Sequence, residues 1–264
     1  MILEIIKAVV LGVVEGVTEF LPVSSTGHLI LVNEWVSFSQ SFSATFTAMF
    51  DVVIQLGAIL AVVFYYRKRF WQMDKATAAK VLLGVVPALL LGWLFADWIE
   101  VNLFDPRVVA AALIVGGAVL IFVEKKQLKP RYQTLEALPW SAVLGVGLVQ
   151  CLAMIPGTSR SAATIIGGLL FGASRVAAVE FSFFLAVPTM VAASGYSLVK
   201  HGAGLSSAEG IVLAVGFVTA FAVALLVIKL FLDYVKKHDF KAFGYYRIVL
   251  GVLILAYFWL AQLN

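Results

Sequence analysis

The chain has 264 residues, of which 62% are hydrophobic and only 13% are charged, and its mean hydropathy is +1.01. About a quarter of the residues of a soluble domain are charged, so this composition excludes a soluble enzyme and predicts a membrane protein. The apolar content excludes a disordered chain, and the single cysteine, Cys151, excludes a disulfide-rich scaffold. A net charge of +4 does not indicate a nucleic-acid partner, because the basic residues lie between apolar runs, where they orient membrane proteins.

The chain begins with an apolar stretch, residues 1–36, that a polar cluster breaks at residues 21–28. Pro22 cannot continue a helix, and the hydroxyl residues after it are typical helix caps. The stretch carries Glu15 and Glu19 and lacks the basic start and cleavage site of a signal peptide. We therefore expect a hairpin of two short helices that belongs to the mature fold.

Six later runs have the length of a membrane-spanning helix, about 20 residues. They cover about residues 46–66, 81–98, 107–123, 176–199, 208–232 and 245–262. A second apolar stretch at 139–172 separates the third run from the fourth, and a cluster at 155–161 that contains Pro156 breaks it. We expect this stretch to form a second helical hairpin.

Lysine and arginine predict the orientation of the spans. Thirteen of the 19 basic residues lie in three connections, 67–80, 124–139 and 234–247. The connections near 97–107 and 200–208 together contribute only Arg107 and Lys200, beside Asp97, Glu100, Asp105 and Glu209. The positive-inside rule places the three basic connections in the cytoplasm. With this orientation, the first hairpin enters the membrane from the outside and the second from the cytoplasm.

The two halves of the chain share one pattern, a broken hairpin followed by three spans. Pro-Val-Ser-Ser-Thr from residue 22 aligns with Pro-Gly-Thr-Ser-Arg from residue 156. We predict an all-α polytopic membrane protein with one domain, 1–264, built as an inverted-topology repeat of about 1–124 and 139–264. Each half is then a re-entrant broken-helix hairpin plus three transmembrane helices. Chance similarity between two short segments is the alternative.

Three ionisable residues, Glu15, Glu19 and Arg160, lie inside apolar stretches. A charged residue at the centre of a spanning helix costs roughly 2.5–3.5 kcal/mol on insertion scales, so these groups must face one another, an ion or water. Glu15 and Glu19 are four residues apart and share a helix face. Such residues mark functional sites, and a purely structural Glu–Arg network is the alternative.

Hydroxyl residues and a histidine follow the first proline: Ser24, Ser25, Thr26 and His28. A histidine near a hydroxyl can act as a general acid or base. Serines after a proline are also ordinary helix caps, and for either serine alone that interpretation is the simpler one.

The second break places Thr158, Ser159 and Ser161 around Arg160. A guanidinium matches phosphate oxygens, and helices that begin near Ser25 and Ser159 add free backbone N–H groups. Together they predict an anion site, most simply for phosphate. The two nearby carboxylates would repel an anion unless a divalent cation, Mg²⁺ or Ca²⁺, bridges them. Four other polar residues inside spans either line this site or pack between helices: Asp51, Gln55, Glu180 and Ser182.

The segment Glu-Gly-Val-Thr-Glu-Phe-Leu-Pro-Val-Ser-Ser-Thr-Gly-His at 15–28, with Pro-Gly-Thr-Ser-Arg-Ser at 156–161, resembles the bacterial undecaprenyl-diphosphatase family, associated with bacitracin resistance. The resemblance covers essentially the whole chain, including Val-Ile-Gln-Leu-Gly at 53–57 and Glu-Phe-Ser-Phe at 180–183. One departure is Ala162, where the family motif carries glycine, and the added methyl removes no reactive group.

The resemblance implies hydrolysis of a C55 polyprenyl pyrophosphate lipid to the monophosphate at the outer face of the bacterial plasma membrane, which recycles the carrier for peptidoglycan synthesis. It also implies a divalent cation and a homodimer. By position, Ser25 would attack the terminal phosphorus, His28 would transfer the proton, and Arg160 would stabilise the phosphoryl oxygens. Glu15 and Glu19 would hold the metal or orient His28. Six polar neighbours would bind the substrate: Ser24, Thr26, Gln55, Thr158, Ser159 and Ser161.

Two alternatives to this chemistry stay open. A metal-bound water can attack directly, with Ser25 only binding phosphate. A transporter, either a lipid flippase or an ion-coupled carrier, would also use inverted repeats with broken helices, but it does not need the Ser-Ser-Thr-Gly-His and Ser-Arg-Ser pairing. Lipid phosphatases of the phosphatidic acid phosphatase type need a histidine six residues after the arginine, where this chain has Ile166.

Overall fold

The structure is a computed structural model that describes residues 1–201 and 205–261, and these residues form helices and loops without a β-strand. The described part contains six helices that are long and apolar enough to cross a membrane, so the prediction of an all-α polytopic membrane protein is confirmed. They are α3 (Ala44–Tyr65), α5 (Lys75–Leu103), α6 (Pro106–Lys125), α9 (Arg175–His201), α10 (Ser207–Val235) and α11 (Lys241–Ala261). Residues 202–204 of the predicted connection at 200–208, and residue 262 of the last predicted span, lie outside the described residues.

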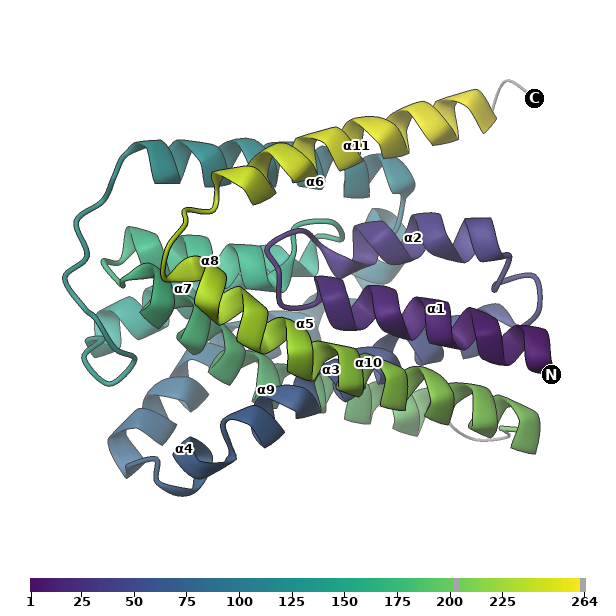
Figure 1. Cartoon of the computed structure of the whole chain (residues 1–264), viewed down its shortest axis with the longest axis horizontal. Coiled ribbons are helices and arrows are strands. Elements are labelled where there is room, and N and C mark those ends of the chain that lie inside the picture. Colours follow the sequence, from purple (N-terminus) through teal and green to yellow (C-terminus); the bar gives the residue numbers. More distant parts are fainter. Residues whose placement is uncertain (202–204, 262–264) are drawn as a thin grey trace.

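Both predicted hairpins are present. The first consists of α1 (Ile2–Thr18) and α2 (Ser25–Val36); the second consists of α7 (Trp140–Gln150), the 3₁₀ turn η1 (Cys151–Met154) and α8 (Arg160–Leu170). In Figure 1 the two hairpins occupy opposite halves of the molecule, and their turns point toward its centre. This placement is the one expected of re-entrant segments from opposite faces, while the inverted repeat of the whole halves stays a prediction.

The basic connections lie together. The short helix α4 (Arg67–Trp71), the loop at 126–139 and the loop at 236–240 are all at the left end of Figure 1. One part of the predicted loop 234–247 is wrong, because α10 continues to Val235 and α11 begins at Lys241. Arg247 therefore lies within α11, where it is fully buried, and it does not belong to a solvent-exposed loop.

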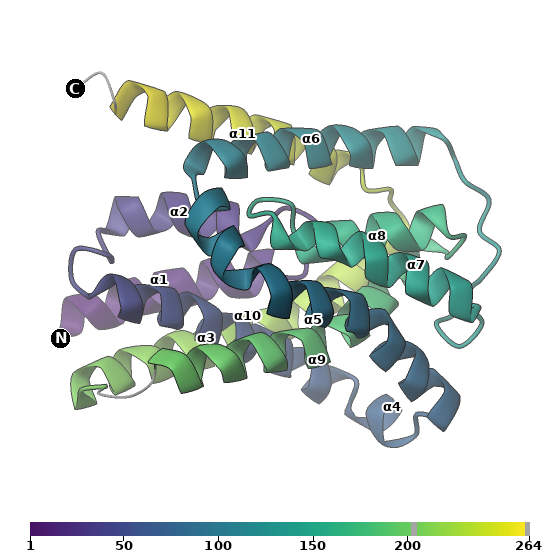
Figure 2. The ribbon, with the colours of Figure 1, turned by 180° about the vertical axis from the view of Figure 1, so that it is seen from behind.

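Close helix contacts position the first hairpin. A Cβ at Gly12 would lie 2.7 Å from the carbonyl oxygen of Gly216, and a Cβ at Gly16 would lie 2.7 Å from that of Ala220. Only glycine permits this approach of α1 to α10, which is how small residues pack membrane helices. On the other side of the molecule, α6 and α11 run side by side, as Figures 1 and 2 show.

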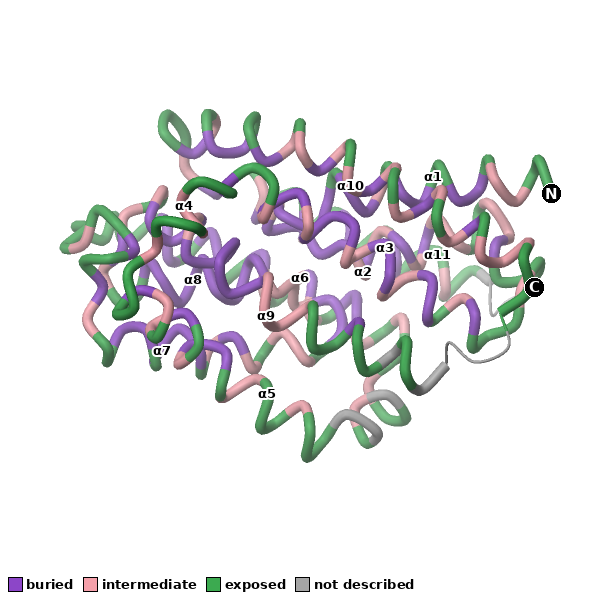
Figure 3. The backbone as a smooth tube through the Cα atoms, turned by 90° about the horizontal axis from the view of Figure 1, so that it is seen from below, coloured by how far each residue is buried: buried purple, intermediate pink, exposed green. Residues whose placement is uncertain are grey.

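The outer faces of the long helices are apolar. Trp93 is 83% exposed and Val115 is 62% exposed, and in Figure 3 such exposed residues follow the outside of the bundle while buried residues follow its inside. In water these faces would form an apolar patch far larger than a soluble monomer presents. They are the lipid-facing surface of a membrane protein.

Candidate active site

The turns of the two hairpins share an unusual backbone conformation. Ser24, the N-cap of α2, has φ 71° and ψ 99°, and Ser159, the N-cap of α8, has φ 70° and ψ 117°. Each serine Oγ accepts a hydrogen bond from a backbone N–H three residues on, in Gly27 and in Ala162. Positive φ is uncommon for a residue with a Cβ and concentrates at functional sites.

This shared conformation changes the alignment of the two breaks. The sequence pattern placed Ser25 opposite Ser159, but the caps make Ser24 equivalent to Ser159 and Ser25 equivalent to Arg160. Ser25 and Arg160 are therefore the first residues of their helices, α2 and α8. The departure at Ala162 leaves the cap intact, because this residue serves it through its backbone N–H.

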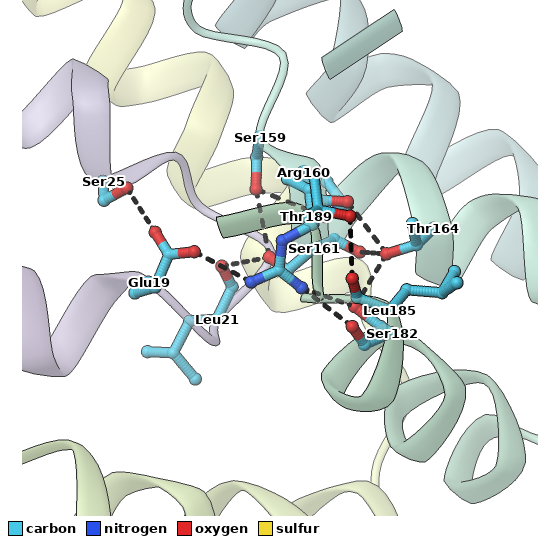
Figure 4. A network of polar contacts seen from close by, with 11 residues as sticks. Glu19, Leu21, Ser25, Ser159, Arg160, Ser161, Thr164, Ser182, Leu185 and Thr189 are labelled. Carbon is cyan, nitrogen blue, oxygen red and sulfur yellow. Dashed lines mark hydrogen bonds and ion pairs between the residues drawn. The ribbon is translucent and has the colours of Figure 1, made fainter. Parts of the chain in front are cut away.

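Glu19 connects the two hairpins. Its Oε1 accepts a hydrogen bond from Nη2 of Arg160 at 2.8 Å, and its Oε2 accepts one from Oγ of Ser25 at 2.8 Å. Figure 4 shows the Glu19 carboxylate between these two side chains. The side chains of Glu19 and Arg160 are only 7% and 10% exposed, so the pair is largely desolvated and its charges depend on each other. The sequence requires each buried charge to face another charge, an ion or water, and Glu19 and Arg160 face each other.

Arg160 has a second set of partners on α9. Its Nη1 donates to the carbonyl oxygen of Ser182 at 2.9 Å and to Oγ of Ser182 at 3.2 Å, and that hydroxyl is 2.7 Å from Oγ1 of Thr164. The Nε of Arg160 is buried and has no partner. A buried unpaired N–H of a charged group is costly, and an oxygen atom of an anionic ligand would satisfy it.

The serines beside Arg160 hold the turns together. Oγ of Ser161 donates to the carbonyl oxygen of Leu21 at 2.8 Å, and it lies 3.1 Å from Oγ of Ser159. Thr158 precedes Ser159 in the turn and is half-buried. These contacts give Ser159 and Ser161 a structural role in addition to the substrate-binding role that the sequence predicts.

The His28 ring forms no hydrogen bond with Ser25 in the described structure. Its Nδ1 is 2.8 Å from the carbonyl oxygen of Ser24, and its Nε2 is 2.6 Å from the hydroxyl of Tyr246 on α11. A carbonyl oxygen only accepts, so Nδ1 carries the hydrogen, and in a neutral ring Nε2 accepts from Tyr246. The proton acceptor closest to Ser25 in this structure is Glu19.

Two other predicted substrate-binding residues are not tied into the hydrogen-bond network of the site. Thr26 lies in the first turn of α2 and Gln55 lies in α3, both half-buried. Neither side chain forms a hydrogen bond with the described residues. Both remain predictions.

Glu15 is the residue best suited to a cation. It is fully buried one helical turn before Glu19, and both of its carboxylate oxygens lack a partner. Glu19, in contrast, already uses both oxygens. Among the described residues, no group of three or more His, Cys, Asp or Glu side chains can hold a metal ion. The donors fit an ion that one carboxylate shares with phosphate oxygens, as is common for Mg²⁺, and they do not fit an all-protein cage.

Sequence reasoning missed Tyr246 and the position of Arg247. Tyr246 meets His28 across 218 positions of sequence, a pairing that no local spacing predicts. Arg247 falls in both the predicted connection 234–247 and the predicted span 245–262, and the structure places it in the spanning helix α11. A charge at the start of an apolar run can lie inside a span.

The fold and the site together define a polytopic membrane protein with a buried hydroxyl, carboxylate and guanidinium at the starts of two helices, a set suited to binding and transferring a phosphoryl group. Comparison of the sequence with known proteins supports the same class. Residues 8–253 match the family described as bacitracin resistance protein BacA. The chain belongs to this family.

Individual relatives match over nearly their whole length. The chain is 50% identical to undecaprenyl-diphosphatase 1 of Clostridioides difficile over 98% of each chain. It is 51% identical to an undecaprenyl-diphosphatase of Lactiplantibacillus plantarum, over 97% of this chain and 98% of the relative. A 47% identical undecaprenyl-diphosphatase of Enterococcus faecalis covers 96% of each.

Proposed function

We propose that this protein is an undecaprenyl-diphosphate phosphatase, which hydrolyses undecaprenyl pyrophosphate to undecaprenyl phosphate and inorganic phosphate. The similarity to the named undecaprenyl-diphosphatases over the full chain supports this activity. The observation that carries it in the structure is the contact of Ser25 with Glu19 and of Glu19 with Arg160. This activity recycles the lipid carrier of peptidoglycan synthesis and confers bacitracin resistance.

In the mechanism that this geometry favours, Ser25 is the nucleophile. Its Oγ forms a bond to the terminal phosphorus while Glu19 takes the hydroxyl proton, and the bond to the bridging oxygen breaks to release undecaprenyl phosphate. Water then cleaves the phosphoserine ester, which releases phosphate and restores the Ser25 hydroxyl, and Glu19 returns its proton to solvent. The free Nε of Arg160 is placed to bind a phosphoryl oxygen, where it stabilises the developing charge.

His28 has a different part in this proposal from the one that its sequence position suggests. Because its ring bonds the carbonyl of Ser24 and the hydroxyl of Tyr246, it orients the start of α2, and the proton of Ser25 passes to Glu19. A water molecule that attacks directly, with Ser25 as a ligand of phosphate, is the competing mechanism.

We also propose that Glu15 would hold a divalent cation, Mg²⁺ or Ca²⁺. The two unpaired, buried oxygens of Glu15 support this assignment. The chemistry that such an ion would supply is neutralisation of phosphate charge, which would make the phosphorus easier to attack.

The site faces the outer side of the bacterial plasma membrane in this proposal. The open ends of the α1–α2 hairpin lie at the end of the molecule opposite the basic connections, and basic connections are typically cytoplasmic. The prenyl tail would stay in lipid along the apolar outer faces. The proposed homodimer is tested by the mass of the detergent-solubilised protein.

Translocation is the second candidate, because hairpins that enter from opposite ends are typical of secondary transporters. One assay separates the two functions. Purified protein in detergent micelles, given undecaprenyl pyrophosphate and Mg²⁺, releases inorganic phosphate if it is a phosphatase. A transporter has no membrane to work across in micelles, so the absence of phosphate release would favour translocation and contradict the proposed function.

A further inference from the structure

Arg247 is the largest fully buried side chain in the described part of the protein. It is the seventh residue of α11, outside both hairpins, and among the described residues no carboxylate pairs with its guanidinium. A buried charge without a counterion is expensive unless other groups solvate it. The hydrogen-bond partners of the guanidinium therefore indicate the role of Arg247.

Four backbone carbonyls surround the guanidinium. On α6, Nη2 donates to Ala112 at 3.2 Å and Nε donates to Leu113 at 3.4 Å. The other two bonds reach the two hairpin turns: Nη1 donates to Pro22 at 3.3 Å, and Nη2 donates to Gly157 at 3.1 Å. One planar group thus connects α6, α11 and both turns of the site.

The two turn carbonyls occupy the same position in their turns. Pro22 stands two residues before the strained cap Ser24, and Gly157 stands two residues before the strained cap Ser159. A backbone held in a sparsely populated conformation persists only when its surroundings fix it. The guanidinium provides such a contact to both turns at once, and its rigid fork fixes the distance between them.

The neighbouring helix leaves room for this side chain. A Cβ at Gly116 of α6 would lie only 2.3 Å from Nη2 of Arg247 and 3.1 Å from its Cζ. Gly157, whose φ is +90°, is pressed against α6 in the same way, since a Cβ there would lie 2.4 Å from the carbonyl oxygen of Val109. The α7–α8 turn at Gly157, the α6 backbone at Gly116 and the guanidinium of Arg247 are therefore packed closely together.

We infer that Arg247 is a positioning residue of the phosphatase site: it holds the α1–α2 turn and the α7–α8 turn at the one separation at which Ser25, Glu19 and Arg160 meet. The inference rests on the proposed assignment of the site to these three residues. Arg247 does not bind the phosphates, because four of its five N–H donors are used by carbonyls. It therefore affects the rate of the chemical step more than substrate binding.

The first test compares Arg247→Met and Arg247→Lys with the wild-type protein, purified in detergent, by kcat and KM for undecaprenyl pyrophosphate. A misplacement of about 1 Å costs roughly 100-fold in rate, so we expect kcat of Arg247→Met to fall about 100-fold while KM changes less than about threefold. The kcat of Arg247→Lys should lie between those of the wild type and Arg247→Met, because the single ammonium group of lysine lacks the forked donors that bond both turns. A KM that rises while kcat stays unchanged would overturn the positioning role and indicate phosphate binding.

The second test moves the guanidinium without removing it. Gly116→Ala places a methyl on Nη2, whereas Gly251→Ala crowds the same α6–α11 interface at Ile114 and Ala110, away from the guanidinium. If Arg247 positions the turns, Gly116→Ala lowers kcat in the wild type and has no further effect in Arg247→Met. Gly251→Ala has the same effect in both backgrounds. If Gly116→Ala, like Gly251→Ala, changes kcat by the same factor in the wild type and in Arg247→Met, the inference is overturned. If Arg247→Met does not fold, the same cycle with Arg247→Lys decides.

The outcome can be separated from that of the proposed site. If Ser25→Ala and Glu19→Gln keep full turnover, the proposed site is wrong, whatever Arg247 does. If they lose turnover while Arg247→Met and Gly116→Ala keep it, only the positioning role is wrong.

Discussion

Glu19 and Arg160 are 141 positions apart in the sequence, yet Oε1 of one lies 2.8 Å from Nη2 of the other at the point where the two hairpin turns meet. The other oxygen of Glu19 holds the hydroxyl of Ser25. A single carboxylate thus joins the proposed nucleophile to the proposed phosphate-binding arginine.

Glu19→Gln should lower kcat about 100- to 10,000-fold, because the amide cannot take the proton of Ser25 and general-base contributions have this size. Phosphate release from undecaprenyl pyrophosphate measures it. Glu4→Gln is the matched control on α1, since Glu4 pairs with the N-terminus far from the turn. A Glu19→Gln protein with more than a third of wild-type turnover would show that Glu19 is not the base.

Breaking the ion pair should also destabilise the protein. Removing one partner of a buried pair costs about 3–5 kcal/mol, because the other charge is left uncompensated. Arg160→Ala and Glu19→Ala should each lower the thermal midpoint in detergent, and the double variant should lose clearly less than the sum of the two. Strict additivity would contradict the direct interaction.

The strained caps predict an unusual preference for glycine over alanine. Left-handed backbone costs a residue with a Cβ about 1–2 kcal/mol, a cost that glycine avoids. At Ser24 and Ser159, the Gly variant should exceed the Ala variant in stability by about that amount more than at Ser43, a capping serine with φ −64°. The same Gly–Ala difference at all three positions in thermal unfolding would argue against strain.

Chelation and Glu15→Gln test the cation. EDTA should abolish phosphate release, and added Mg²⁺ or Ca²⁺ should restore it. Glu15→Gln should need a higher cation concentration for half-maximal activity, while its thermal midpoint no longer rises with Mg²⁺ as that of the wild type does. An unchanged cation dependence in Glu15→Gln would remove this residue from the ion site.

Much of this fold could be predicted from the sequence, because span length, proline breaks and basic loops are local patterns. The six spans and both hairpins follow from them. The pairing of Glu19 with Arg160 is one of the arrangements that the sequence allows, since a buried charge must face another charge, an ion or water. The pairing of Ser25 with Glu19 was not, because it depends on the path of the turn between them.

Arg247 shows the limit most clearly. This arginine lies where a predicted connection and a predicted span overlap, and the packing of α11 against α6 decides that it is buried and bonded to the turn carbonyls. Likewise, the contact of His28 with Tyr246 joins elements far apart in the chain, so its geometry is a property of the tertiary structure alone.

The central claim is that the Ser25 hydroxyl, held by Glu19, is the nucleophile. The most direct measurement is phosphate release from undecaprenyl pyrophosphate by purified Ser25→Ala in detergent, beside Ser43→Ala, which loses an exposed capping hydroxyl outside the site. The account predicts that Ser25→Ala loses turnover by at least about 1,000-fold while Ser43→Ala keeps it. A folded Ser25→Ala protein with near wild-type turnover would contradict it.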